Sequence, residues 1–124
     1  MKHVLVLAAA LSVSAGTLVA HHAGAEYDRE HPVTMTGTVA TFEFANPHAR
    51  IHFDVKDEKG AVTRWIAETA PPMRLFRVGW KRDSLKPGDS ITVTGFPAKD
   101  GSKTLGLRRL MPPNGGEPLT EGNE

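Results

Sequence analysis

Residues 34–55, TMTGTVATFEFANPHARIHFDV, decide the fold that we predict for this chain. The first apolar positions alternate with threonines, and they are Val33, Met35 and Val39. This period of two is typical of a strand with one buried face. The apolar positions then shift by one residue, to Phe42 and Phe44. Because such a shift moves side chains to the opposite face, we expect a bulge or sharp bend near residues 40–41.

The second half of the stretch predicts a second strand joined to the first by a turn. Its apolar residues alternate with polar ones, and they are Ile51, Phe53 and Val55. Residues 45–48, Ala-Asn-Pro-His, lie between the two apolar patterns. We therefore expect a hairpin that carries His48 at its tip.

The rest of the chain predicts three more strands and one short helix. The five expected strands cover residues 33–44, 49–56, 62–68, 90–98 and 103–110. Between the third and fourth, Pro72 near the start and Gly79 just past the end indicate a short helix. Its apolar residues Met73, Leu75 and Phe76, with Trp80 beside them, are expected to plug the bottom of a sheet.

Three strands, a helix and two strands is the element order of the OB-fold, a five-stranded Greek-key barrel. The predicted class is therefore all-β with one short helix, and residues 33–111 form the barrel domain. An open β-sandwich fragment is the alternative, and the position of the helix argues against it.

The two ends of the chain are expected to lie outside this barrel. Residues 1–20 combine a basic start, an uncharged apolar run and small residues, which indicates a secretory signal peptide. Cleavage after Ala20 or after Ala25 fits this pattern. Residues 21–32 predict an extended arm, and residues 112–124 predict a flexible tail with little to bury. The expected location is periplasmic or secreted, with no membrane span once the signal is removed.

Composition excludes several classes of function. The chain has 15 basic and 14 acidic residues, so no overall excess of charge draws it to nucleic acid or to an anionic membrane. It has no cysteine, so a metal site would use histidine, carboxylate or methionine side chains or the terminal amine.

Five histidines follow the signal segment: His21, His22, His31, His48 and His52. If cleavage follows Ala20, the free amine and Nδ1 of His21 can chelate one metal ion. His48, held by the turn, is the predicted third ligand, with His22 as a competitor. Nitrogen ligands in a planar arrangement favour Cu(II). The predicted site is a histidine brace, with copper as its cofactor.

Simpler interpretations compete with this site. The histidines fit equally well as exposed residues of an arm and a loop. His52 lies too far along its strand to share an ion with His48 unless the strand bends. Met35 and Met73 fit the core better than a copper site.

Several phrases along the chain resemble one family of small exported bacterial proteins of unknown function. They are HH followed by EYD, PVTMTGTV, NPHARIHFDVKD, W-x-x-E, GWKRDSLKPGD and ITVTGFPAKDGS. The resemblance covers residues 21–110 and implies His21, His22, Asn46, Pro47 and His48 as motif residues. Ala23-Gly24 departs from the Ser-Phe that is common in the family, and this change creates the cleavage site after Ala25.

These observations predict a periplasmic copper carrier or buffer, with a metal ion and another envelope protein as partners. The alternative is a metal-free envelope module that binds a protein or small ligand through the barrel face carrying Arg50, His52 and Asp54. An oxidative copper enzyme ranks last, because so small a domain offers little surface for a polymer substrate.

Overall fold

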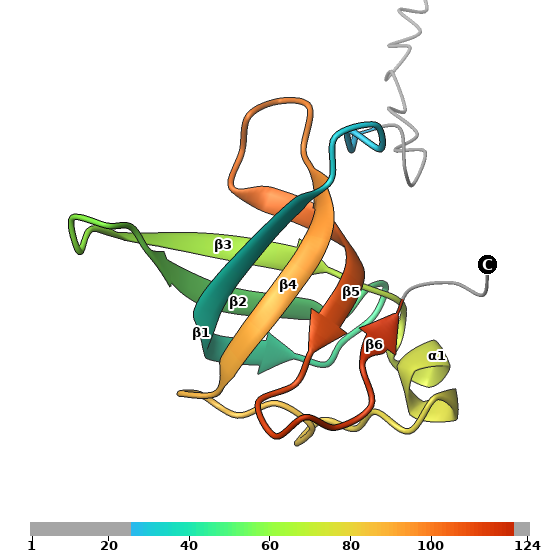
Figure 1. The fold of residues 1–124 in the computed structure, drawn as a ribbon. Coiled ribbons are helices and arrows are strands. Elements are labelled where there is room, and N and C mark those ends of the chain that lie inside the picture. The colour runs from blue at the N-terminus through green and yellow to red at the C-terminus, as the bar shows by residue number, and fades with distance from the viewer. Residues whose placement is uncertain (1–25, 121–124) are drawn as a thin grey trace, which may run out of the picture.

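The computed structural model describes residues 26–120, which form a closed five-stranded β-barrel with one short helix (Figure 1). The elements, in chain order, are β1 (Val33–Glu43), β2 (Arg50–Lys56), β3 (Val62–Glu68), α1 (Pro72–Arg77), β4 (Ser90–Pro97), β5 (Thr104–Met111) and β6 (Leu119–Thr120). The strand order is β3-β2-β1-β4-β5-β6, and a parallel pairing of β3 with β5 closes the barrel. The predicted fold class is confirmed.

The long first strand bends where the sequence predicts. Its first part pairs with β4 and its second part with β2, and the register with β2 shifts between Val39 and Thr41. Val39 is buried before the bulge, and Phe42 is half-buried after it. The bulge therefore lets β1 pair with β4 and then with β2 while its apolar side chains stay inside the barrel.

A glycine permits the close crossing of β1 and β2. A Cβ on Gly37 would lie 2.7 Å from the main-chain oxygen of Asp54 and 2.8 Å from Cδ2 of Phe53. Because real Cβ atoms do not approach other atoms so closely, this position accepts only hydrogen as a side chain.

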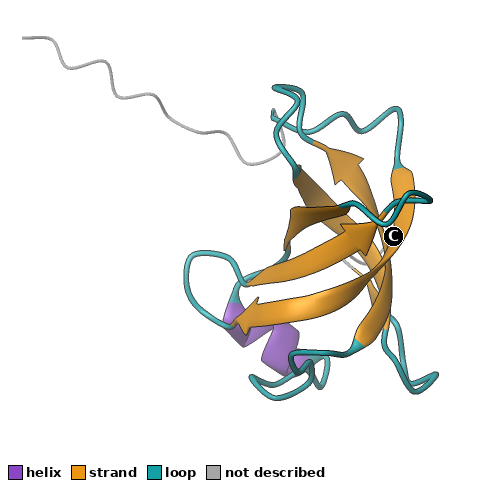
Figure 2. Cartoon of the chain, turned by 90° about the vertical axis from the view of Figure 1, so that its left-hand side faces the viewer, coloured by secondary structure: helices purple, strands orange, loops and turns teal. Residues whose placement is uncertain are grey.

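Apolar side chains from the five barrel strands, from β6 and from α1 fill the interior. The largest fully buried ones are Phe53, Ile51, Leu75, Ile91, Leu105, Leu107, Leu110, Leu119, Val39 and Val93. The helix covers one end of the barrel (Figure 2). Only Leu75 of α1 is buried, and Trp80 beside it is 8% exposed.

The prediction that Met73 and Phe76 fill the core is wrong. Met73 is 65% exposed and Phe76 is 60% exposed. A helix of six residues turns less than twice, so only one side can face the barrel, and Leu75 occupies that side. Met35, in contrast, packs against the core as predicted.

The C-terminal segment also differs from the prediction that residues 112–124 form a flexible tail with little to bury. Leu119 is only 1% exposed, and residues 119–120 pair with Arg109 and Leu110 of β5 as strand β6. A single leucine in a polar segment gives no periodic signal, but burying one leucine side chain stabilises a domain by about 1.5–3 kcal/mol.

Candidate metal site and ligand pocket

The turn that carries His48 is fixed by three hydrogen bonds to the end of β3. The main-chain N–H of Ala49 donates to the oxygen of Ala70 at 3.1 Å, and that of Thr69 donates to the oxygen of Ala49 at 2.9 Å. Nδ1 of His48 donates to the oxygen of Thr69 at 3.1 Å. A carbonyl can only accept, so Nδ1 carries the proton and Nε2 is the nitrogen with a free lone pair.

This arrangement is the one that metal-binding histidines use. One ring nitrogen donates to a carbonyl or carboxylate, which sets the tautomer and the orientation of the ring, and the other binds the metal. His48 is half-buried. Next to it, Thr69 is 2% exposed, and its hydroxyl has no hydrogen-bond partner within residues 26–120.

Two other histidines have carboxylate partners. Nδ1 of His31 lies 2.9 Å from Oδ2 of Asp28 on the arm, and Nε2 of His52 lies 3.4 Å from Oε2 of Glu43. The hydrogen bond from His31 lowers the pKa of Asp28 below its ordinary value. Within residues 26–120, no three histidine or carboxylate side chains are grouped to hold a metal ion. The predicted ligands His21 and His22 lie outside the described residues.

The arm joins the barrel at the end away from the His48 turn (Figure 1). The main-chain oxygen of Glu26 accepts from Lys99 at 2.7 Å, and Tyr27 pairs with Ala98. The His48 turn instead lies near α1 (Figure 1).

The polar barrel face proposed for the alternative function is occupied by pairs within the chain. Arg50 lies 3.6 Å from Glu68, and His52 pairs with Glu43 as described above. Arg64 forms two hydrogen bonds to Asp54, at 2.7 and 2.8 Å, and they lower the pKa of Asp54. These groups satisfy one another, so this face offers few polar groups that lack partners.

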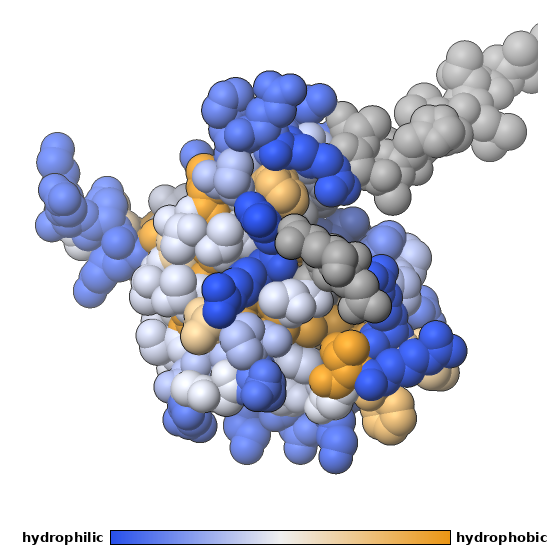
Figure 3. Space-filling view, turned by 45° about the vertical axis from the view of Figure 1, so that its right-hand side comes forward, coloured by the Kyte–Doolittle hydropathy of each residue, from blue (hydrophilic) through white to orange (hydrophobic). Residues whose placement is uncertain are grey.

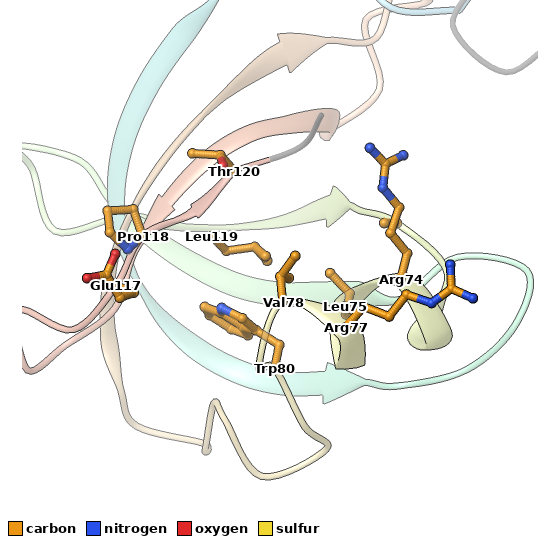
Figure 4. A pocket seen from close by; sticks show the side chains of 10 residues that line it. Arg74, Leu75, Arg77, Val78, Trp80, Glu117, Pro118, Leu119 and Thr120 are labelled. Atoms are coloured by element: carbon orange, nitrogen blue, oxygen red, sulfur yellow. The ribbon is translucent and has the colours of Figure 1, made fainter. Parts of the chain in front are cut away.

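A pocket that the sequence analysis missed lies between α1 and the C-terminal segment. Its volume is about 320 Å³. Val78, Trp80 and Leu119 form its middle, with Glu117 and Pro118 at one end and Arg74 and Arg77 at the other (Figure 4). Both guanidinium groups extend away from Trp80 (Figure 4). No sequence pattern predicts this pocket, because it depends on the unexpected docking of residues 117–120.

A family model matches residues 8–108 of the chain. The chain belongs to this family, described as a family of unknown function (DUF6152). The membership agrees with the resemblance to a family of unknown function. Export, the His21-His22 start and the role of the Asn46-Pro47-His48 turn stay predictions for this DUF6152 protein. No protein with a curated description matches the chain.

Solved structures with a similar arrangement include nucleic-acid-related proteins. The mitochondrial single-stranded DNA binding protein Rim1 of S. cerevisiae is 13% identical, with a TM-score of 0.49 over 74% of this chain and 97% of that chain. Apo TiaS, a tRNAIle2 agmatidine synthetase, is 17% identical, with a TM-score of 0.44 over 69% of this chain. The ZRD-deleted mutant of TiaS with agmatine is 20% identical, with a TM-score of 0.45 over 76% of this chain. The chain spans only 19% and 23% of those two TiaS chains. At these levels the similarities carry no argument about function.

No helix within residues 26–120 is long and apolar enough to cross a membrane.

Proposed function

We propose that this protein is an exported OB-fold carrier or buffer for copper. The proposed ligands are the amine and imidazole of His21 and the imidazole of His48, with His22 competing as a ligand. The observation that carries the proposal is the hydrogen bond from Nδ1 of His48 to Thr69, which leaves Nε2 as the donor atom on a fixed turn. The absence of cysteine in the sequence restricts the site to nitrogen and oxygen ligands or methionine.

The chemistry of these ligands suits Cu(II). An α-amino group has an ordinary pKa of about 7.7–8.0, so a metal can displace its proton near neutral pH. An amine and two imidazoles provide three nitrogen donors, and nitrogen ligands in a tetragonal arrangement favour Cu(II) over Zn(II).

Chain length limits how the site is assembled. From Glu26 to Thr69, the hydrogen-bonded route passes Lys99, Ala98, Thr104 and Ile66. The length of this path is about 28 Å, from strand spacings of about 4.8 Å and rises of about 3.3 Å per residue. Five extended residues span at most about 18 Å. The imidazole of His48 and the metal bonds have to make up the difference.

Copper titration of the mature protein tests the proposal. Protein that begins at His21 should bind one Cu(II) ion with a dissociation constant below micromolar. His48→Ala should weaken binding by about ten-fold or more. An added Met before His21 should also weaken it, because the chelating amine moves.

His52→Ala is the matched control, since His52 is also half-buried but pairs with Glu43. Binding that is no tighter than micromolar, or that is equally reduced in His48→Ala and His52→Ala, would reject the copper proposal.

A metal-free module that binds a small ligand is the second candidate. The pocket between α1 and residues 117–120 favours it, because its volume falls in the range of small-molecule sites. The intact mass of the secreted protein separates the two functions. A mature start at Glu26 removes His21 and His22 and supports the second candidate, whereas a start at His21 supports the copper site.

A further inference from the structure

Three large apolar side chains project from the helical end of the barrel into solvent. Met73 is 65% exposed, Phe76 is 60% exposed and Val78 is 63% exposed. They are three of the five exposed large hydrophobic residues in the described part of the chain, and six positions contain all three. Exposed apolar side chains gathered in this way mark an interaction surface more often than isolated ones do.

The same segment carries a local excess of positive charge. Residues 73–82 contain Arg74, Arg77, Lys81 and Arg82 and no acidic residue. None of these four forms an ion pair within residues 26–120. The total charge of the chain is nearly balanced, but residues 73–82 form a local basic region. The sequence predictions did not include this region. On this side of the molecule, hydrophobic and strongly hydrophilic surfaces lie next to one another (Figure 3).

The apolar part of this face is a shallow groove on a rigid base. Phe44, Pro72, Met73 and Phe76 line it, and its volume is about 340 Å³. Beneath it, the ring of Phe42 packs edge-on against those of Phe44 and Trp80, with centroids 5.6 and 6.2 Å apart. The guanidinium carbon of Arg82 lies 5.8 Å from the centre of the Phe44 ring, so one cation lies directly at the groove.

We propose that this face, residues 73–82 with Phe44, binds the surface of a bilayer that contains anionic lipids. Large apolar side chains beside long cationic ones match the boundary between acyl chains and phosphate groups, where arginine stems lie along apolar surface and their ends reach the headgroups. Met73 and Phe76 enter the acyl region, and Arg74 and Arg77 contact phosphates. The outward direction of these two guanidinium groups fits a planar anionic partner better than a ligand inside the pocket (Figure 4). This proposal is independent of copper binding.

Vesicle sedimentation tests the proposal with the full mature protein. We expect binding to vesicles of equal parts phosphatidylglycerol and phosphatidylcholine, and none to pure phosphatidylcholine. Each cation near an anionic surface contributes about five-fold to partitioning. Arg74→Gln with Arg77→Gln should therefore lower the partition coefficient by about twenty-five-fold, and high salt should also lower it. Phe76→Ser should lower the partition coefficient by about ten-fold, because the variant loses the aromatic side chain that enters the acyl region.

Matched controls lie on the β2–β3 hairpin, on another side of the barrel. Lys56→Gln with Lys59→Gln removes the same charge, and Val62→Ser removes a side chain that is 59% exposed. These controls should bind anionic vesicles as the unmutated protein does. Equal losses in the controls, equal binding to neutral vesicles or no binding at low salt would overturn the proposal. So would a dimer in solution that Phe76→Ser converts to a monomer, because a second copy would then cover the face.

Discussion

Nδ1 of His48 donates a hydrogen bond to the main-chain oxygen of Thr69, 21 positions along the chain and 3.1 Å away. This bond joins the tip of the first hairpin to the segment that leads from β3 into α1. Because the acceptor belongs to the main chain, no substitution at Thr69 removes it. The orientation of the His48 ring is thus a property of the fold, and the copper proposal depends on that orientation.

Gly37→Ala should destabilise the barrel, by about 1–3 kcal/mol. The added methyl group would meet the main chain of Asp54, which cannot move without disturbing the pairing of β1 and β2. Chemical denaturation measures the effect. Gly116→Ala is the control, because the nearest atom to its Cβ would lie at an ordinary 3.5 Å. This variant should be as stable as the unmutated protein. Equal stability of the two variants would contradict the close crossing.

Leu119→Ala should lower the free energy of unfolding by about 2–5 kcal/mol, as large-to-small substitutions in a core do. Thr120→Ala, which changes an exposed neighbour in the same short strand, should cost less than about 0.5 kcal/mol. Thermal or urea unfolding distinguishes them. A Leu119→Ala variant as stable as the unmutated protein would show that residues 117–120 do not belong to the core.

Asp54 should stabilise the fold at neutral pH and lose this effect in acid. Its pKa in the folded state is lowered, chiefly by the hydrogen bonds from Arg64. A carboxyl whose folded pKa is below its unfolded pKa stabilises above the unfolded value, about 3.9 for aspartate, and the effect disappears as pH falls through the folded value. Arg64→Gln should therefore raise the pKa of Asp54 in an NMR titration and reduce stability at pH 7 but not in strong acid.

Arg109→Gln provides the control for this titration. Arg109 is exposed and forms no ion pair within residues 26–120. Its loss removes the same charge but should leave the pKa of Asp54 in place. The same upward shift of the pKa in both variants would point to general charge effects instead of the Arg64 contact.

The protein should not bind single-stranded DNA at physiological salt, although some OB-folds do. OB-folds that bind single strands stack bases on exposed aromatic rings along a basic groove. The aromatic residues of β2 and β3 are Phe53, which is fully buried, and Trp65, which packs against the core. Fluorescence anisotropy with a labelled oligothymidylate should show no saturable change, and saturable micromolar binding would contradict this expectation.

Much of the fold follows from local patterns in the sequence. The shift from Val39 to Phe42 predicted the bulge, and Lys86-Pro87-Gly88-Asp89 has the features of a tight turn, with Gly88 at a φ of 92° and a hydrogen bond from Asp89 to Lys86. These features depend on residues that are close in sequence. They are caused by the alternation of apolar residues and by the conformational freedom of glycine. Both causes can be recognised in the sequence alone.

The features that escaped prediction all depend on contacts between distant segments. Leu119 has no periodic neighbours, and its burial results from pairing with β5. Met73 and Phe76 have helical spacing, but the short helix turned only Leu75 inwards. For the site, the sequence singled out His48 and its turn, but it could not reveal Thr69 as a partner or the position of the arm. Spacing along the chain does not determine either one.

Paramagnetic broadening of amide NMR signals by a small amount of Cu(II) tests the copper proposal most directly, in protein that begins at His21. We predict that the signals of Ala49, Thr69 and Ala70 disappear first, because these residues form the hydrogen bonds that hold the His48 turn. Broadening confined to residues 26–31, with those three signals unchanged, would place the metal on the arm with His31 and contradict a site shared by His21 and His48.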